Sequence, residues 1–353
     1  MKKLFVAATV TLFSICSAVV AQEHEEKTEV VLDGLHNPSG LAVQPGTGHL
    51  FVSDSGAGKI VRIVDGKAED VVTDFPSDVY GKGPKYNIGP LGLAFIDEDT
   101  LVVGGGGKPD TEEVIRVYTV PKAGEEAIKA DAMKATLGPL ESNEEEAAEG
   151  NYYAVAVTKT GIFATANGDD TKGWVVRAAI NEDGTFGDLE RYIATKEATN
   201  VDAPVAITVS PKGHLVVGQM GEITAPNDGL VTFYDAKSKK MLLNLETGLH
   251  DETALIYSPK GHLYALDFAW AKPEDGGLYR LDAEGKGDEQ QITPKKIVAL
   301  KKPAAIAFGT DGSLYIAVFG DTEGDGEEAD PEKAATGPDI KLQSGLSTRV
   351  GSS

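Results

Sequence analysis

Cysteine is almost absent from this sequence, which has a single one, Cys16, among 353 residues. The chain therefore has no cysteine pair for a disulfide and no cysteine cluster for zinc. It also lacks a His-Glu-x-x-His metal motif, a Gly-x-Ser-x-Gly nucleophile turn and a phosphate-binding glycine loop before a helix. Apolar residues nowhere keep a helical period for more than a few residues, which argues against a helical fold.

Basic side chains are also scarce. The chain has 33 lysines and arginines against 55 aspartates and glutamates, and its formal net charge is −22. Such a negative field repels nucleic acid and anionic membranes, so neither is expected as a partner. Cations and cationic surfaces are the favoured partners; the alternative is that the acidity only keeps the protein in solution.

What the sequence does have is internal repetition. Ser-Pro-Lys-Gly-His-Leu occurs at residues 210–215 and again at residues 258–263. Similar turns recur about every 50 residues, a period typical of solenoids and propellers. The first large apolar residues after these turns mark six units: Leu50, Leu101, Phe163, Leu215, Leu263 and Leu314.

Each unit is predicted to contain four strands. An apolar run such as residues 40–43 leads into a tight turn, and a second apolar run such as residues 50–52 follows it. A third run, such as residues 59–63, alternates apolar with polar residues, and a more polar fourth run closes most units. Because four such strands repeated radially form a propeller blade, the sequence predicts an all-β fold: a six-bladed β-propeller with four-stranded antiparallel blades.

The two ends of the chain predict how the ring closes. The sixth unit has no convincing fourth strand after residues 339–342, whereas an orphan strand, residues 29–32, precedes the first unit. Pairing the ends would remove two exposed sheet edges, which are otherwise sites of aggregation. We therefore expect the N-terminal strand to close the last blade, and residues 22–353 to form one domain.

The first 21 residues have the pattern of a secretory signal. Lys2 and Lys3 precede an apolar stretch, residues 4–15, and small residues at 19–21 predict cleavage before Gln22. The apolar stretch is short for a membrane-spanning helix. We expect residues 1–21 to be a cleaved signal peptide and the mature chain to be a secreted or periplasmic monomer without a membrane span. A lipoprotein modified at Cys16 and an uncleaved anchor are the alternatives.

One stretch carries a family resemblance. Residues 37–43, Asn-Pro-Ser-Gly-Leu-Ala-Val, continue through Leu50-Phe51-Val52-Ser53-Asp54 into residues 59–63, and this sequence is similar to an NHL repeat. The whole chain resembles the six-bladed group that contains gluconolactonase or senescence marker proteins and strictosidine synthase-like proteins. The other five units match mainly in their hydrophobic skeleton. Such a resemblance implies the fold more strongly than the function.

Propellers commonly bind ligands in a central funnel, at the loops that lead into the first strand and out of the second strand of each blade. Aligning the units predicts that polar residues gather there, as a hard cation or a general acid/base requires. Glu252 is the predicted catalytic or metal-binding carboxylate. The predicted ligand-binding residues are His36, Asn37, Asn151, Tyr152, Asp202, His250 and Asp251.

A second ring is predicted where the second strand of each blade ends. Asp54, Asn167 and Asp267 occupy this position in units one, three and five and are candidate metal ligands. The alternative is structural: in blades of this type the aspartate after the second strand ties down a loop by accepting backbone hydrogen bonds.

The resemblance also argues against the best-known enzyme of the group. Lactonase-type members place metal-binding Asn and Asp residues immediately before the glycine that opens the first strand. None of the corresponding residues here is a carboxylate or an amide: they are Ser39, Leu91, Tyr153, Val205, Thr253 and Ala304. A lactonase would therefore need a different set of ligands.

One acidic loop has the spacing of a calcium site. Counted from Asp321 at the first place, Asp325 holds the fifth place, Gly326 the sixth and Glu332 the twelfth. The loop follows a strand and has Pro331 at its eleventh place, so a solvated acidic loop is the alternative to Ca²⁺ binding by Asp321 and Asp325.

Two functions remain from the sequence. The first is a secreted propeller that binds a small molecule, glycan or protein through its funnel and long loops. The second is an enzyme that acts in the funnel and depends on a divalent cation, either a lactonase-like hydrolase or a lyase, with Ca²⁺ as the candidate cofactor. The missing ligands before the glycines favour the first.

Overall fold

The computed structural model describes residues 28–80, 85–143, 146–166, 172–285, 287–319 and 340–343. The predicted signal peptide, Asn167 and the acidic loop with Asp321 and Asp325 lie outside these residues. Within the described part, no helix is long and apolar enough to cross a membrane. The only elements besides strands in that part are short helical turns, of which α1 (Thr195–Thr199) is the longest.

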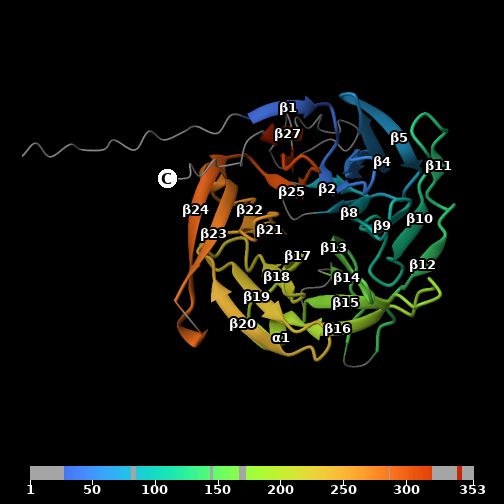
Figure 1. Ribbon diagram of the computed structural model, residues 1–353. Helices are drawn as coiled ribbons and strands as arrows, with labels where there is room; N and C mark the ends of the chain where they lie inside the picture. Colours follow the sequence, from blue (N-terminus) through green and yellow to red (C-terminus); the bar gives the residue numbers. More distant parts are fainter. Residues whose placement is uncertain are drawn as a thin grey trace, which may run out of the picture.

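Five sheets are each built mainly from one continuous segment and lie around a common centre (Figure 1). The first contains β2 (Pro38–Val43), β3 (Leu50–Asp54), β4 (Lys59–Val64) and β5 (Lys67–Thr73), with β11 (Ile128–Lys129) added at its outer edge. The second contains β8 (Pro90–Phe95), β9 (Thr100–Gly105), β10 (Ile115–Thr119) and β12 (Ala135–Leu137).

The next three sheets follow the same plan. The third contains β13 (Tyr152–Thr158), β14 (Gly161–Ala166), β15 (Trp174–Ala179) and β16 (Glu190–Ala194). The fourth contains β17 (Pro204–Val209), β18 (Leu215–Gln219), β19 (Leu230–Tyr234) and β20 (Met241–Glu246). The fifth contains β21 (Glu252–Tyr257), β22 (Leu263–Asp267), β23 (Gly277–Glu284) and β24 (Gln291–Ala299). The prediction of an all-β propeller with four-stranded antiparallel blades is thus confirmed.

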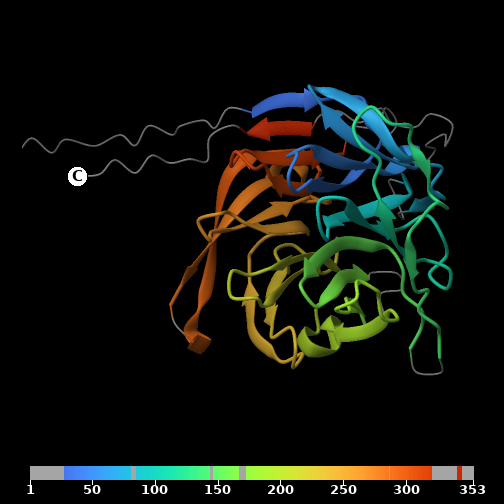
Figure 2. The ribbon, with the colours of Figure 1, turned by 45° about the vertical axis from the view of Figure 1, so that its right-hand side comes forward.

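A further sheet combines the two ends of the chain. It contains β25 (Pro303–Phe308), β26 (Leu314–Val318), β27 (Ile340–Gln343) and β1 (Thr28–Leu32). β1 pairs antiparallel with β27, with Thr28 opposite Gln343, and the two strands lie side by side at the rim (Figure 2). A two-stranded hairpin, β6 (Asp78–Tyr80) and β7 (Tyr86–Ile88), is inserted between the first two sheets.

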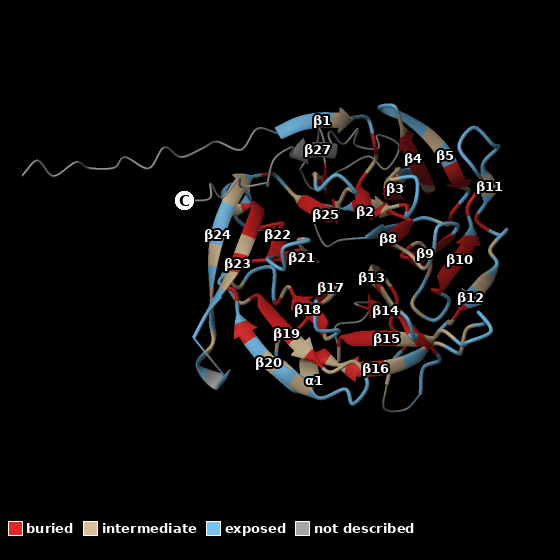
Figure 3. Cartoon of the chain, viewed as in Figure 1, coloured by how far each residue is buried: buried red, intermediate tan, exposed pale blue. Residues whose placement is uncertain are grey.

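The inner strands neighbour one another in a closed order, β2, β8, β13, β17, β21, β25 and again β2. Apolar residues fill the spaces between successive sheets, as where Phe163 and Val175 of the third sheet pack against Ile207 and Leu215 of the fourth. Burial falls from the inner strands to the outer ones, so the edge strands β1, β20 and β24 are largely exposed (Figure 3). This gradient explains why the fourth run of each unit is the most polar.

The strand register corrects one alignment. Leu50, Leu215, Leu263 and Leu314 begin the second strand of their sheets, as the repeat predicts. In the third sheet, however, Ile162 holds this position, because it pairs with Val157 as Leu50 pairs with Val43. Phe163 is one residue too far along, and the adjacent large apolar side chains made the two indistinguishable in the sequence.

Candidate functional site

A narrow central channel runs between the inner strands. Its volume is about 70 Å³, and Ser39, Tyr153, Thr253 and Ala304 are among the residues that line it. Its hydroxyl groups are used within the fold: Ser39 Oγ donates to Asn37 O at 2.9 Å, and Thr253 Oγ1 donates to Pro303 O at 2.7 Å. Tyr153 Oη donates across to Ala304 O at 3.3 Å. The Thr253 bond joins neighbouring sheets, the Tyr153 bond spans the channel, and the Ser39 bond stays within its own loop.

Four aromatic side chains close one end of the channel, and we call them the aromatic cap: Tyr86, Phe268, Trp270 and Phe319. They form one apolar cluster with the channel residues Ala304 and Tyr153. Trp270 stacks on Phe268 with ring centroids 5.1 Å apart, and Tyr86 packs edge-on against Trp270 and Phe319 at 5.6 and 5.3 Å. The rings thus pack over the channel residues Tyr153 and Ala304.

Two buried aspartates hold the loop after β22, which carries Phe268 and Trp270 of the cap and which we call the cap loop. Asp267 accepts three backbone N–H groups: Oδ1 from Asp251 at 2.9 Å and Ala269 at 3.1 Å, and Oδ2 from His250 at 3.0 Å. Asp251 Oδ2 in turn accepts the N–H of Trp270 at 2.6 Å. Each carboxylate therefore takes backbone donors that would otherwise be buried without partners.

The Asp251 carboxyl is in an unfavourable electrostatic environment. Burial raises its pKa to about 6, and the nearby negative charge of Asp267 adds to this, while the hydrogen bond from the Trp270 N–H acts in the opposite direction. A carboxyl that titrates near neutrality is often functional, but a structural network can shift a pKa in the same way. Here Asp251 Oδ2 is engaged with the cap loop.

His250 lies beside this network with both ring nitrogens engaged. Nδ1 accepts the N–H of Asn227 at 3.3 Å, and Nε2 lies 3.2 Å from Asp275 Oδ2. Because Nδ1 is an acceptor, we assign the ring proton to Nε2, which donates to Asp275. His250 thus joins two loops of the funnel face, and its side chain is mostly buried.

Glu252, the predicted catalytic residue, is fully buried and does not line the channel. Its Oε1 accepts a short hydrogen bond from Thr247 Oγ1, and its Oε2 has no partner among the described residues. The carboxyl lies against Gly229, where an ideal Cβ atom would come within 2.1 Å of Oε2. Burial raises the pKa of Glu252 well above its usual range, which favours the protonated form in the fold.

This geometry predicts the behaviour of Glu252→Gln. The amide keeps the shape of the protonated acid, so we expect the free energy of unfolding at pH 4, below the unfolded pKa, to change by no more than about 1 kcal/mol. Since the folded pKa of Glu252 is raised, the stability of the wild type should fall as pH rises above the unfolded pKa, and this part of the fall should be absent in the variant. Urea titrations between pH 4 and pH 9 measure this fall; parallel curves for the two proteins would contradict the assignment.

The remaining predicted ligand residues also have partners in the fold. His36 N donates to Asp54 Oδ1 at 2.6 Å, and Asn37 Nδ2 donates to Asn87 O at 3.0 Å. Burial raises the pKa of Asp54, against the effect of the His36 hydrogen bond. Asp54 and Asp267 thus accept backbone hydrogen bonds, as expected for loop anchors, the structural alternative to metal ligands. They fix the loop that precedes the first strand, and Asp267 also fixes the loop that follows the second strand.

Backbone conformation explains why asparagine occurs at the loop position just before the first strand of two sheets. Asn37, Asn151, Ala203 and Lys302 all have positive φ, between 48° and 54°. Asparagine tolerates this conformation better than most residues, which explains its presence at two of these positions without any ligand. Tyr152, next to Asn151, is fully buried, and its hydroxyl donates to Glu149 O at 3.3 Å.

Asp202 is also bonded within the fold, and the strand-exit position predicted for Asn167 is held by another residue. Asp202 Oδ1 accepts the N–H of Ala203 at 2.7 Å, and Oδ2 forms a short ion pair with Lys196. In the third sheet Ala166 pairs with Tyr152, as Asp54 pairs with Pro38 in the first. Ala166, and not Asn167, therefore holds the equivalent strand-exit position.

The donor sets do not fit a metal in the described part of the chain. No three His, Cys, Asp or Glu residues there are placed to share one ion. Of the candidate ligands within it, Asp267 uses both carboxylate oxygens to accept backbone N–H groups, and Asp54 uses Oδ1 in the same way. Calcium takes six or more oxygens, and these positions do not supply them.

Sequence reasoning named Glu252 but missed most of the aromatic cap. A signal was present: Phe268 and Phe319 each directly follow the last residue of a second strand, Asp267 and Val318. Tyr86 could not be found in this way, because its hairpin is an insertion outside the repeat.

No family model matches this sequence, and a search of curated proteins finds no match. Solved structures do resemble its fold. A luciferin-regenerating enzyme has a TM-score of 0.58 at 11% identity, covering 91% of this chain and 96% of its own. A protein from Thermus thermophilus assigned as an oxidoreductase of the glucose dehydrogenase kind has a TM-score of 0.58 at 17% identity, covering 90% and 99%. A gluconolactonase from Xanthomonas campestris has a TM-score of 0.53 at 13% identity, covering 82% and 86%.

Proposed function

We propose that this chain is a binding propeller, secreted or periplasmic, that presents the loops around its aromatic cap to a small molecule, glycan or protein. The single observation that carries this proposal is the cap itself. Tyr86, Phe268, Trp270 and Phe319 pack over the channel residues Ala304 and Tyr153, where a funnel enzyme of this fold would need an open pocket. The signal-like residues 1–21 support an extracytoplasmic site of action, and the acidity supports a cationic partner.

The proposal includes a ring of six blades closed by the N-terminal strand. The pairing of β1 with β27 supports it, as does the closed order of the six inner strands. A closed ring gives the funnel face a fixed shape, which favours binding because little conformational freedom of the loops is lost when a partner docks.

A divalent-cation-dependent hydrolase of the lactonase kind is the second candidate. It is favoured by the likeness to a gluconolactonase. That likeness supports the fold and not the activity. The channel positions where lactonase-type members have metal ligands here hold hydroxyl and apolar groups. This candidate requires the cap to open and a metal site that the described residues do not form.

A turnover panel separates the two candidates. The mature chain and Trp270→Ala are assayed with aldonolactones and aryl esters, with added Ca²⁺ and with EDTA. We expect no turnover above buffer in any condition for either protein, because removing one ring opens the channel without creating ligands. Calcium-dependent turnover by the wild type would contradict the binding function and favour the hydrolase. Faster turnover by Trp270→Ala than by the wild type would show that the cap limits access of the substrate.

A further inference from the structure

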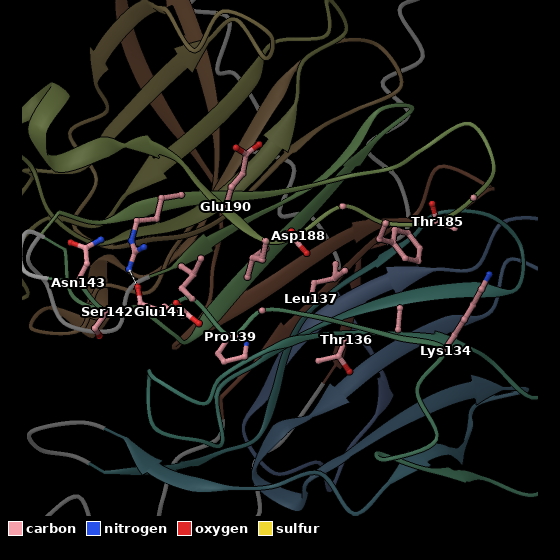
Figure 4. Close-up of a pocket in the computed structure, with 18 residues that line it drawn as sticks. Lys134, Thr136, Leu137, Pro139, Glu141, Ser142, Asn143, Thr185, Asp188 and Glu190 are labelled. Carbon is pink, nitrogen blue, oxygen red and sulfur yellow. Dashed lines mark hydrogen bonds between the residues drawn. The ribbon is translucent and has the colours of Figure 1, made fainter.

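A large cavity lies at the rim of the propeller, away from the channel, and we call it the peripheral groove. Its volume is about 820 Å³, and its walls are residues 134–143 and residues 184–191 (Figure 4). The first wall is β12 and the turn that follows it; the second is the turn before β16 and the first two residues of that strand. Cavities of about 300–1,000 Å³ are typical of ligand sites.

The walls of the groove expose backbone as well as side chains. Every residue in each run contributes to the lining, whereas a strand wall made of side chains alone would contribute alternate residues. β12 and β16 are both terminal strands of their sheets, so neither has a second strand neighbour among the described residues. Backbone donors and acceptors on such an edge form a template for another extended chain.

The floor of the groove is apolar and fixed. Leu137 and Leu140 are buried there, and Phe186 and Leu189 pack on the same cluster with part of their surface exposed. Arg191 joins the two walls: its Nη2 donates to Glu141 O at 2.7 Å and to Ala147 O at 2.8 Å. The groove is therefore shaped before any ligand binds, which lowers the entropic cost of binding.

The rim of the groove is negative. Glu141 and Asp188 are exposed carboxylates without an ion pair or hydrogen bond from their side chains to a described residue, whereas Glu190 is paired with Arg177 at 2.9 Å. The lining has two basic residues, Lys134 and Arg191, and the Arg191 guanidinium is engaged by Glu141 O, Ala147 O and the Glu146 carboxylate. The whole chain carries a formal charge of −22. An occupant with positive charge is complementary to this rim.

We propose that the peripheral groove binds an extended basic segment of a partner protein, which adds as a strand to the free edge of β12. β12 is favoured over β16 because the whole of β12 lies in the lining. Main-chain hydrogen bonds to this edge supply affinity, and alternate side chains supply specificity. Apolar residues of the segment face the part-exposed Phe186 and Leu189, and lysine or arginine residues face Glu141 and Asp188. This site is independent of the function proposed for the cap face.

The test uses a fluorescent synthetic peptide of alternating lysine and valine, titrated against the mature chain by anisotropy at physiological salt. Glu141→Lys combined with Asp188→Lys should weaken binding about tenfold or more, through lost attraction and added repulsion. Glu246→Lys is the matched control, since Glu246 is an exposed carboxylate on β20 outside the groove; it should leave binding unchanged. The same peptide methylated at alternate backbone nitrogens should not bind.

Several results would overturn the proposal. Equal affinity for the methylated peptide would mean that attraction is only electrostatic, and unchanged binding by the double variant would place the peptide elsewhere. Failure of the peptide to bind, or displacement of it by a neutral oligosaccharide, would show that the groove does not take a basic strand. Changes in amide chemical shifts on adding the peptide, confined to residues 134–143 and 184–191, would support the proposal. Both variants change exposed side chains, and matching melting temperatures verify that they fold.

Discussion

Asp267→Ala is expected to destabilise the protein by on the order of 4 kcal/mol, because the substitution removes one buried acceptor from three backbone donors. The N–H groups of His250, Asp251 and Ala269 all bond to this carboxylate, which is 1% exposed. Alanine leaves these donors without partners in a place that water does not reach. Chemical denaturation followed by circular dichroism measures the loss.

Asp54→Ala is the matched control for this prediction. Asp54 holds the same strand-exit position in the first sheet, but its carboxylate accepts the backbone N–H of His36 rather than a set of three. We expect it to cost about 1.5 kcal/mol. Equal losses at the two positions would show that the number of backbone donors is not what matters. Stabilisation of the wild type by added Ca²⁺, lost in either variant, would favour metal binding instead.

The repeat predicted the architecture well because the signals that define it are local. A tight turn followed by a large apolar residue fixes the start of each second strand, so Leu215 and Leu263 lie where the pattern placed them. Where two large apolar residues are adjacent, as at Ile162 and Phe163, the sequence cannot tell which faces which side, and only cross-strand pairing decides.

The candidate site was harder to predict, because residue type alone does not show which polar side chains are buried. Glu252 and Asp251 are adjacent acidic residues, and the sequence does not show that one is sealed against Gly229 while the other holds the N–H of Trp270. The aromatic cap combines residues far apart in the chain, one of them from an inserted hairpin. The outer strand of the second blade, β12, also comes from a segment with no strand pattern of its own.

The carboxylates of the funnel face illustrate a general ambiguity. An aspartate that ends a strand beside a cleft suits both a metal ligand and a loop anchor, since both roles need a buried oxygen acceptor. Counting backbone donors separates the roles. Asp267 accepts three of them, so little of its coordinating capacity remains.

Asp251→Asn is expected to change the pH dependence of stability. Burial raises the folded pKa of Asp251 to about 6 from an ordinary value of 3.8, so the folded state holds this proton more tightly than the unfolded state. Its contribution is therefore present in full below about pH 4 and is lost as pH rises through about 6. Between pH 4 and pH 7 the unfolding free energy of the wild type should therefore fall by roughly 2–3 kcal/mol relative to that of the variant.

Urea titrations across this range test the shift, and comparing the two proteins cancels the contributions of Glu252 and other buried acids. Asparagine keeps an oxygen that can accept the N–H of Trp270, so the cap loop should stay in place. Because the chain has two tryptophans, a Trp174→Phe background makes Trp270 the sole reporter, and its emission should be equal at pH 4 in both proteins. If the difference stays constant with pH, Asp251 titrates at its ordinary value, and the carboxylate does not couple the cap to protonation.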